Sequence, residues 1–188
     1  MSTTIDLLEA FESDDSTLEL SLIRLGENET AVVPFTAQAT QVDLHYCDEP
    51  ELRGYVRCNG LDCTLCRLGK AIAQRSLLPV YLPLTGAIGV VAISPVRSPK
   101  SLLSQLHPYL RAEQAQVLFV TRKGHEYRVE GRPLQEGQPD GAAAIAAFQE
   151  RVESGAISLE EVYPTYSNED LLAIDSIQRL AELKGVAA

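Results

Sequence analysis

All four cysteines of the chain and one of its three histidines fall within one stretch, HYCDEPELRGYVRCNGLDCTLCR, residues 45 to 67. Cys63 and Cys66 form a C-x2-C pair, a spacing at which two thiolates bind one tetrahedral ion from a tight turn. Cys58 lies five residues upstream of Cys63, and either His45 or Cys47 supplies a fourth ligand from the same face of an expected strand. Zinc accepts both nitrogen and sulfur ligands. The stretch therefore predicts a zinc site in which His45 and Cys47 are alternatives for the fourth position.

Three other interpretations of the cysteines stay open. They are buried free thiols that pack as small hydrophobes, a redox-active dithiol, and an iron–sulfur cluster. The polar residues Asn59, Asp62 and Thr64 between and beside the cysteines favour a ligand loop over a core. Four protein ligands leave no position for water, so we expect a structural ion whose binding contributes to folding.

Charge is divided unevenly along the chain. The formal net charge is -10, yet residues 51–132 hold twelve basic against five acidic residues, a local net charge of +7. Residues 1–50 hold eleven acidic residues against one basic, and residues 133–188 hold ten against three. A basic central segment between acidic ends is typical of a local binding site for a polyanion. Chance segregation of solvated charges along the chain gives the same pattern.

Aromatic residues alternate with these basic ones, a combination that suits single-stranded nucleic acid, because cations follow the backbone and rings stack on bases. The clearest case is Arg53-x-Tyr55-x-Arg57, which shares one face of an expected strand directly before Cys58. Each residue alone is more often an ordinary surface residue, so the whole set carries the hypothesis. The candidate nucleic-acid-binding residues are Arg53, Tyr55, Arg57, Arg67, Lys70, Arg75, Tyr81, Arg111, Arg122, Lys123, Tyr127 and Arg128.

The elements that position these residues are mostly short strands. Alternation of apolar and polar residues predicts strands at 17–25, 30–35, 40–47, 51–58, 76–84, 87–94, 115–121 and 125–130. Two prolines, Pro79 and Pro83, place the 76–84 strand at a sheet edge. Helices are expected after Ser98 as N-cap, at 141–154 and at 168–184. For the last helix, either Ser167 or Asn168 is the expected N-cap and Gly185 the expected end. Many short strands with few helices favour a sandwich or a small barrel.

The run LELSLIRLGENETAVVPF, followed by VDLHYC, YVRC and CTLC, resembles the zinc-containing single-stranded DNA-binding proteins of T-even-type phages. Twelve residues separate His45 from Cys58, as that family's ligand pattern requires, and the similarity covers about residues 17–130. The resemblance implies a mainly β, OB-fold-like small barrel with an inserted zinc knuckle, here followed by two acidic C-terminal helices in place of the family's acidic tail. It also implies sequence-tolerant binding of single strands, and it favours His45 with Cys58, Cys63 and Cys66 as ligands. Cys47 stays the alternative.

The sequence thus predicts an acidic arm at 1–16, an OB-fold-like core at 17–135 with a zinc subdomain at about 40–75, and an acidic helical segment at 136–188. We expect single-stranded DNA binding in replication, recombination or a mobile-element system, with the acidic ends contacting replication or recombination proteins. The alternative is a zinc-stapled protein–protein adaptor that does not bind nucleic acid.

Enzymes and membrane proteins are not indicated. The chain contains no P-loop, G-x-G-x-x-G or H-E-x-x-H motif, and neither His107 nor His125 has an evident nucleophile partner. It contains no signal-peptide pattern and no apolar run of about 20 residues. We therefore expect a cytoplasmic, non-enzymatic protein whose thiols stay reduced.

Overall fold

A computed structural model describes residues 20–112, 116–134 and 141–185, and within them the chain is mainly β, as the alternation predicts. Eight strands form one open mixed sheet in the order β1-β6-β5-β2-β7-β8, with β3 pairing to β4 and β5 off this path. The strands are β1 (Ser21–Leu22), β2 (Thr30–Pro34), β3 (Thr40–Glu49), β4 (Leu52–Arg57), β5 (Ile72–Leu82), β6 (Ala87–Ile93), β7 (Gln116–Lys123) and β8 (Glu126–Pro133). The helices are α2 (Thr64–Arg67), α3 (Leu102–Leu110), α4 (Ala142–Glu153), the 3-10 turn η1 (Leu159–Val162), α5 (Asn168–Leu172) and α6 (Asp175–Lys184).

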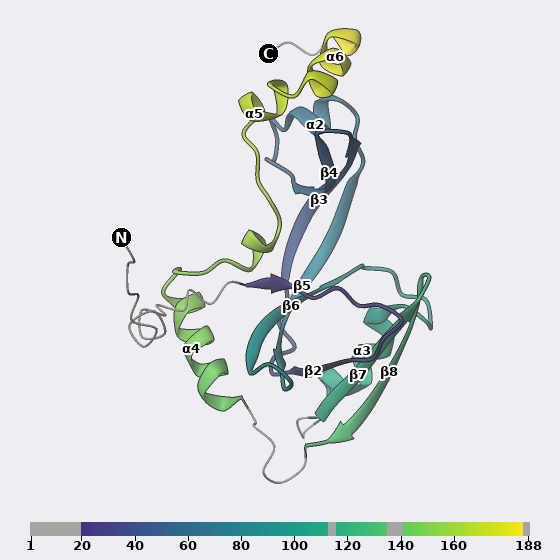
Figure 1. The fold of residues 1–188 in the computed structure, drawn as a ribbon, viewed down its shortest axis with the longest axis vertical. Helices are drawn as coiled ribbons and strands as arrows, with labels where there is room; N and C mark the ends of the chain where they lie inside the picture. Colours follow the sequence, from purple (N-terminus) through teal and green to yellow (C-terminus); the bar gives the residue numbers. More distant parts are fainter. Residues whose placement is uncertain (1–19, 113–115, 135–140, 186–188) are drawn as a thin grey trace, which may run out of the picture.

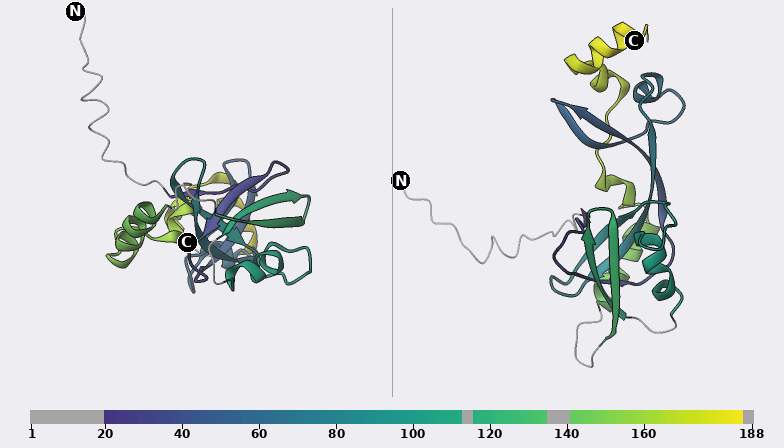
Figure 2. Two further views of the ribbon diagram at one scale, coloured as in Figure 1. Left: turned by 90° about the horizontal axis from the view of Figure 1, so that it is seen from below. Right: turned by 90° about the vertical axis from the view of Figure 1, so that its right-hand side faces the viewer.

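The molecule has a broad body and a narrow column (Figure 1). The body contains β2, β6, β7, β8 and α3, with α4 at its side, and the column contains β4, α2, α5 and α6. Strands β3 and β5 run from the body into the column. The segment that follows α4, which includes η1, runs beside them to α5 and α6. A side view shows α6 at the far end of the column, beyond α2 (Figure 2). The column thus corresponds to the expected zinc subdomain with the C-terminal helices added to it.

Strand β5 lies inside the sheet, so its prediction as an edge strand was wrong. It pairs with β6 over Ser76–Leu82 on one side, and on the other side with β3 up to Leu77 and with β2 from Val80. Pro79 falls in the gap between the last β3 pair and the first β2 pair. A proline without an N–H is tolerated there because no ladder partner faces that part of the edge.

The β3–β5 ribbon changes its buried face where it leaves the body. Val42 and Leu44 on β3 point into the core of the body, whereas His45 and Cys47 are buried on the opposite face in the column. Successive residues of a strand point to opposite faces, so this switch is made between Leu44 and His45 without an interruption of the pairing. One ribbon therefore carries two separate cores.

Three clusters of buried side chains hold the fold. One packs the sheet against α4 through Phe148, one packs it against α3 through Leu102 and Leu106, and the third fills the column. Helix α3 begins at Ser101, whose hydroxyl accepts from the Ser104 N–H at 3.3 Å, and not at the expected Ser98. The Ser98 carbonyl instead accepts from the Ser101 N–H at 2.9 Å, which makes a turn before the helix.

The expected helix at 168–184 is two helices at an angle, with Ala173 and Ile174 between them. Ser167 caps α5 in a capping box with Asp170, and Gly185 ends α6 in the left-handed conformation, both as the sequence indicates. In the described part of the expected strand at 17–25, residues 20–25, the regular strand is β1, whose two residues pair in parallel with β6. The predicted arm at 1–16 lies outside the described residues. Within the described chain, every helix is too short or too polar to cross a bilayer.

Candidate functional site

The structure brings His45, Cys58, Cys63 and Cys66 together in the column, with their ligand atoms all within 4.8 Å of one another. The Nε2 atom of His45 is 3.3 Å from Cys66 Sγ and 3.6 Å from Cys63 Sγ. Cys58 Sγ is 3.5 Å from Cys66 Sγ. Ligand atoms bonded to one tetrahedral ion at about 2.0–2.3 Å are themselves roughly 3.3–3.8 Å apart. The cluster therefore fits a structural metal site.

Local folding places the two outer ligands. His45 lies on β3, and Cys58 directly follows β4, where its N–H donates to the Asp43 carbonyl at 2.9 Å. Because β3 and β4 are paired along their length, the ends of these two segments are fixed relative to each other.

The other two ligands come from the knuckle, which we define as residues 58–69. Gly60 has φ +83°, a conformation that favours glycine, and its carbonyl accepts from the Cys63 N–H at 3.2 Å. Cys63 is the N-cap of α2 and Cys66 lies within that single turn. The turn brings both thiols to the same side, as the C-x2-C spacing predicts.

The imidazole of His45 is fully buried and held in one orientation. Its Nδ1 atom lies 3.2 Å from the Ala71 carbonyl, which accepts only from a protonated nitrogen. In the neutral tautomer that makes this hydrogen bond, Nε2 carries the free lone pair and faces the thiols, as in a metal ligand. A carbonyl partner on the second ring nitrogen is the usual support of a ligand histidine.

Electrostatics within the cluster favours a cation. Burial, the hydrogen bond with Cys58 and the negative charge of Cys63 raise the pKa of Cys66 to about 12. Burial alone would raise the pKa of Cys63, but backbone N–H groups in the knuckle offset it, and the net shift is downward. Several thiolates so close together repel one another in a buried space, and a bound cation removes that repulsion.

Cys47 lies outside the cluster, although it projects to the same face of β3 as His45. Its side chain is buried in the apolar core of the column, among Leu52, Val56 and Leu171. Burial raises the pKa of the Cys47 thiol, which keeps it protonated. The structure thus brings His45, not Cys47, to the fourth position.

The C-terminal helices are attached directly to the knuckle. Asn59, the neighbour of ligand Cys58, donates through Nδ2 to the Tyr166 carbonyl at 2.7 Å. Lys184 on α6 donates to the Leu68 carbonyl at 2.5 Å, at the end of α2. Leu171 and Ile177 add apolar contacts to the core of the column. Sequence reasoning missed this attachment because the partners are more than 100 residues apart and no local pattern records them.

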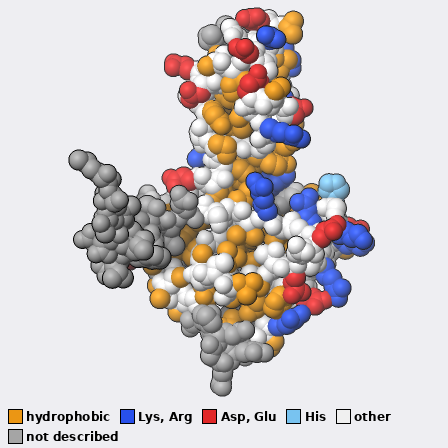
Figure 3. Space-filling model, viewed as in Figure 1, with side chains coloured by type: hydrophobic (Ala, Val, Ile, Leu, Met, Phe, Trp, Pro, Cys, Tyr) orange, Lys and Arg blue, Asp and Glu red, His pale blue; other side chains and the backbone are white. Residues whose placement is uncertain are grey.

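A groove of about 760 Å³ lies where the base of the column meets the β7–β8 hairpin and the loop before α3. Its charged lining is Arg24, Arg75 and Arg122, and no Asp or Glu of the described chain lines it. Its rings are Tyr55, Tyr127, Tyr163 and His125, and its hydroxyls come from Ser94, Ser98 and Ser101. Figure 3 shows Lys and Arg side chains gathered on this side of the molecule. We call it the basic groove.

Two arginines of the basic groove lie against tyrosine rings. The guanidinium carbon of Arg75 is 5.2 Å from the centre of the Tyr55 ring, and Arg75 Nη2 donates to the Tyr55 hydroxyl at 3.0 Å. At the other side, the guanidinium carbon of Arg122 is 5.6 Å from the centre of the Tyr127 ring. Such cation–π contacts fix the planes of the guanidinium groups while leaving their charge unneutralised.

Four of the predicted nucleic-acid-binding residues therefore line the basic groove: Tyr55, Arg75, Arg122 and Tyr127. Four more are exposed outside it: Arg53, Arg67, Arg111 and Lys123. The sequence missed Arg24, His125 and Tyr163 as groove residues. Arg24 and Tyr163 lie in acidic segments, where their neighbours in sequence gave no sign of a basic site.

Three further predicted residues have acidic partners in the structure. Arg57 forms an ion pair with Glu160, and Arg128 pairs with Glu130 at 2.5 Å. Lys70 pairs with Asp48 at 3.1 Å and with Glu49 at 2.5 Å.

The prediction of Tyr81 as a base-stacking residue was wrong. Its ring is 2% exposed in the core of the body, packed against Gly141. Its side chain belongs to the buried cluster that includes Phe148 and Leu159, and this packing on its face of the sheet buries the ring.

Comparison of the chain with known protein families, with curated proteins and with solved structures finds no match. The function must therefore be argued from the geometry of the metal site and the basic groove.

Proposed function

We propose that this protein binds single-stranded DNA in the basic groove, with a structural zinc ion holding the column that forms one wall of the groove. The observation that carries the proposal is the composition of the groove. Three arginines and four rings are among its lining residues, and no carboxylate from the described residues lines it, in a chain of 26 acidic and 16 basic residues. A surface selected only for solubility has no reason to exclude acids from one concave region of an acidic protein.

The chemistry of this lining matches a flexible polyanion with exposed bases. Guanidinium groups bind phosphate oxygens through two parallel hydrogen bonds, and tyrosine rings stack on bases. Every base has a flat face, so stacking does not select a sequence. Bases of a duplex are already stacked and paired, which is why rings favour single strands.

Zinc is the ion that the ligand set favours. Three cysteines and one histidine in tetrahedral spacing are typical of structural zinc sites, whereas most iron–sulfur clusters take four thiolates. All four positions are held by the protein, so the site leaves no place for a reactive water. Its role in the proposal is to hold β3, β4 and α2 together and thereby to position Tyr55 and Arg75.

We also propose that the sheet is arranged as an OB-fold-like barrel, as the resemblance implies. The sheet path has β1 and β8 at its ends, and a barrel requires the ends to approach each other. The segment after β1 supports such an arrangement, because the Gly26 carbonyl accepts from the Arg122 N–H on β7 at 2.7 Å. Replication, recombination or a mobile-element system is the proposed setting, with the acidic ends contacting partner proteins.

A titration of labelled oligo-dT, followed by fluorescence anisotropy on protein of measured metal content, tests the proposal. We expect binding whose affinity falls with salt, with a log–log slope of about −2 for three phosphate contacts. Arg75→Ala and Arg122→Ala should each weaken binding about tenfold, the equivalent of about 1.4 kcal/mol. Arg111→Ala is the matched control, because this arginine is exposed but does not line the groove.

Absence of oligo-dT binding by the metal-loaded protein at low salt would overturn the proposal. Equal losses in all three arginine variants would show that binding is a diffuse effect of charge and not a property of the groove. A partner captured from a nuclease-treated extract, without any oligonucleotide binding, would favour the adaptor function instead.

A further inference from the structure

Tyr46 is a solvent-exposed aromatic residue that does not line the basic groove but lies close to it. Its side chain is 49% exposed on β3, directly opposite Tyr55 on β4 in the strand register. The two ring centres are 5.3 Å apart and the rings are inclined at 68°, so one ring meets the other by its edge. This contact holds the Tyr46 ring against Tyr55, and the exposure of Tyr46 leaves part of the ring available to solvent.

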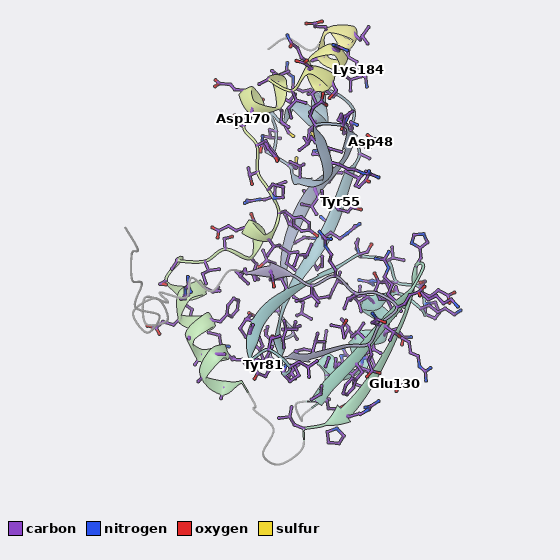
Figure 4. All side chains as sticks on the ribbon, in the orientation of Figure 1. Asp48, Tyr55, Tyr81, Glu130, Asp170 and Lys184 are labelled. Carbon is purple, nitrogen blue, oxygen red and sulfur yellow. The ribbon has the colours of Figure 1, made fainter. Side chains whose placement is uncertain are left out.

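Tyr46 also lies on the same face of the ribbon as the groove residues of the column. The register pairs Tyr46 with Tyr55 and Val42 with Arg75, and residues paired in antiparallel strands share a face. Tyr163 extends the series at the other end, with its ring centre 6.3 Å from that of Tyr55. Tyr163, Tyr55 and Tyr46 thus form a row of rings that leaves the groove and rises along the column; Figure 4 shows Tyr55 in the lower part of the column.

The row has a defined end. The next residue on this face of β3 is Asp48, which is exposed and would repel a phosphate, although Lys70 pairs with it at 3.1 Å. Arg53 stands opposite Asp48 in the register and is exposed. Arg53 therefore lies close to Tyr46, the last ring of the row, at the point where the acidic residue Asp48 follows on β3.

We propose that a single strand bound in the basic groove continues up the column and stacks a further base on Tyr46, with Arg53 beside its phosphate. This inference rests on the proposed function and adds a binding position that the groove itself does not include. The ligand is a single-stranded oligonucleotide long enough to reach from the groove to Tyr46.

The chain contains no tryptophan, so one introduced indole reports on one position. We would prepare Tyr46→Trp and, as the matched control, Gln41→Trp, which places the indole at an exposed position on the opposite face of the same strand. Both proteins are titrated with oligo-dT of about 4 to 16 nucleotides, the range of site sizes for proteins of this kind. Anisotropy of a labelled oligo-dT measures total binding to the unaltered protein in parallel.

We expect the indole fluorescence of Tyr46→Trp to be quenched only by oligonucleotides above a threshold length, and no quenching of the control. Tyr46→Leu should weaken binding of the longest oligonucleotide about fivefold or more and leave that of the shortest unchanged. Binding by anisotropy without selective quenching of Tyr46→Trp would overturn this inference and leave the groove proposal intact. Absence of anisotropy change with every length would overturn both.

Discussion

The side chain of Asn168 links the C-terminal helices to the metal knuckle on both sides of ligand Cys63. Its Oδ1 accepts from the Thr64 N–H at 3.0 Å, and its Nδ2 donates to the Asp62 carbonyl at 2.9 Å. The segment before Asn168 carries Tyr163 into the wall of the basic groove. The metal site, the C-terminal helices and the groove are therefore parts of one connected arrangement.

Replacing Asn168 should loosen this connection. Asn168→Ala removes three hydrogen bonds to the knuckle, those with Asp62, Thr64 and Asn59, and we expect the free energy of unfolding of the metal-loaded protein to fall by about 1–3 kcal/mol. Urea denaturation measures the loss. Asn168→Asp is the control, because it keeps the oxygen that accepts from Thr64; equal stability of the alanine variant and the unaltered protein would refute the link.

Removal of the metal should unfold the column, since the shared ion joins β3, the end of β4 and the knuckle through four ligand residues. The unaltered protein should bind one zinc ion, and a chelator should expose the C-terminal helices to protease. Limited proteolysis with and without the chelator measures the change, and an unchanged cleavage pattern after complete loss of the metal would contradict the expectation.

The choice between the two fourth-ligand candidates has its own test. Cys47→Ala should keep one zinc ion while losing some stability, because it leaves a small void in the core of the column. His45→Gln should lose most of the metal. Elemental analysis of the purified variants decides, and retention of zinc by His45→Gln with loss by Cys47→Ala would reverse the assignment.

Arg57 and Arg75 should contribute unequally to oligonucleotide binding although both lie close to Tyr55. Arg57 is already paired with Glu160, whereas Arg75 lies in the groove without an acidic partner among its described contacts. We expect Arg57→Ala to change affinity less than threefold and Arg75→Ala to reduce it about tenfold. Glu160→Gln should tighten binding and steepen its salt dependence. The anisotropy titration measures all three variants.

Alkaline pH should destabilise the protein partly through Tyr163. Burial raises the pKa of this phenol above 10.0, its ordinary value, so the native state keeps a proton that the unfolded chain releases. The contribution to stability is complete below pH 10 and is lost as the pH rises through the native pKa. Ultraviolet titration should show a late-ionising phenol whose signal is lost in Tyr163→Phe. A native titration curve unchanged by that substitution would contradict the expectation.

Local chemistry decided much of the architecture. Alternation of apolar and polar residues was enough to place most strands, and Ser167 and Gly185 marked the two ends of the C-terminal helical segment. These signals are readable because side-chain direction and capping depend only on residues a few positions apart. The interior position of β5 in the sheet could not be predicted from its sequence, because an edge strand and an interior strand differ in which strands pair with them and not in their own residues.

The sequence by itself determined the ligand types, the knuckle spacing and a basic, aromatic centre between acidic ends. Only the tertiary structure decided that His45 reaches the cluster while Cys47 enters the core, since positions two apart on a strand are about 6.6 Å apart and only one lies at the knuckle. It also decided how the cations are distributed: Glu160 meets Arg57 across 103 residues, while Arg24 joins Arg75 in the groove. Charge pairing and groove composition arise from contacts between distant segments, and composition along a chain does not record which segments meet.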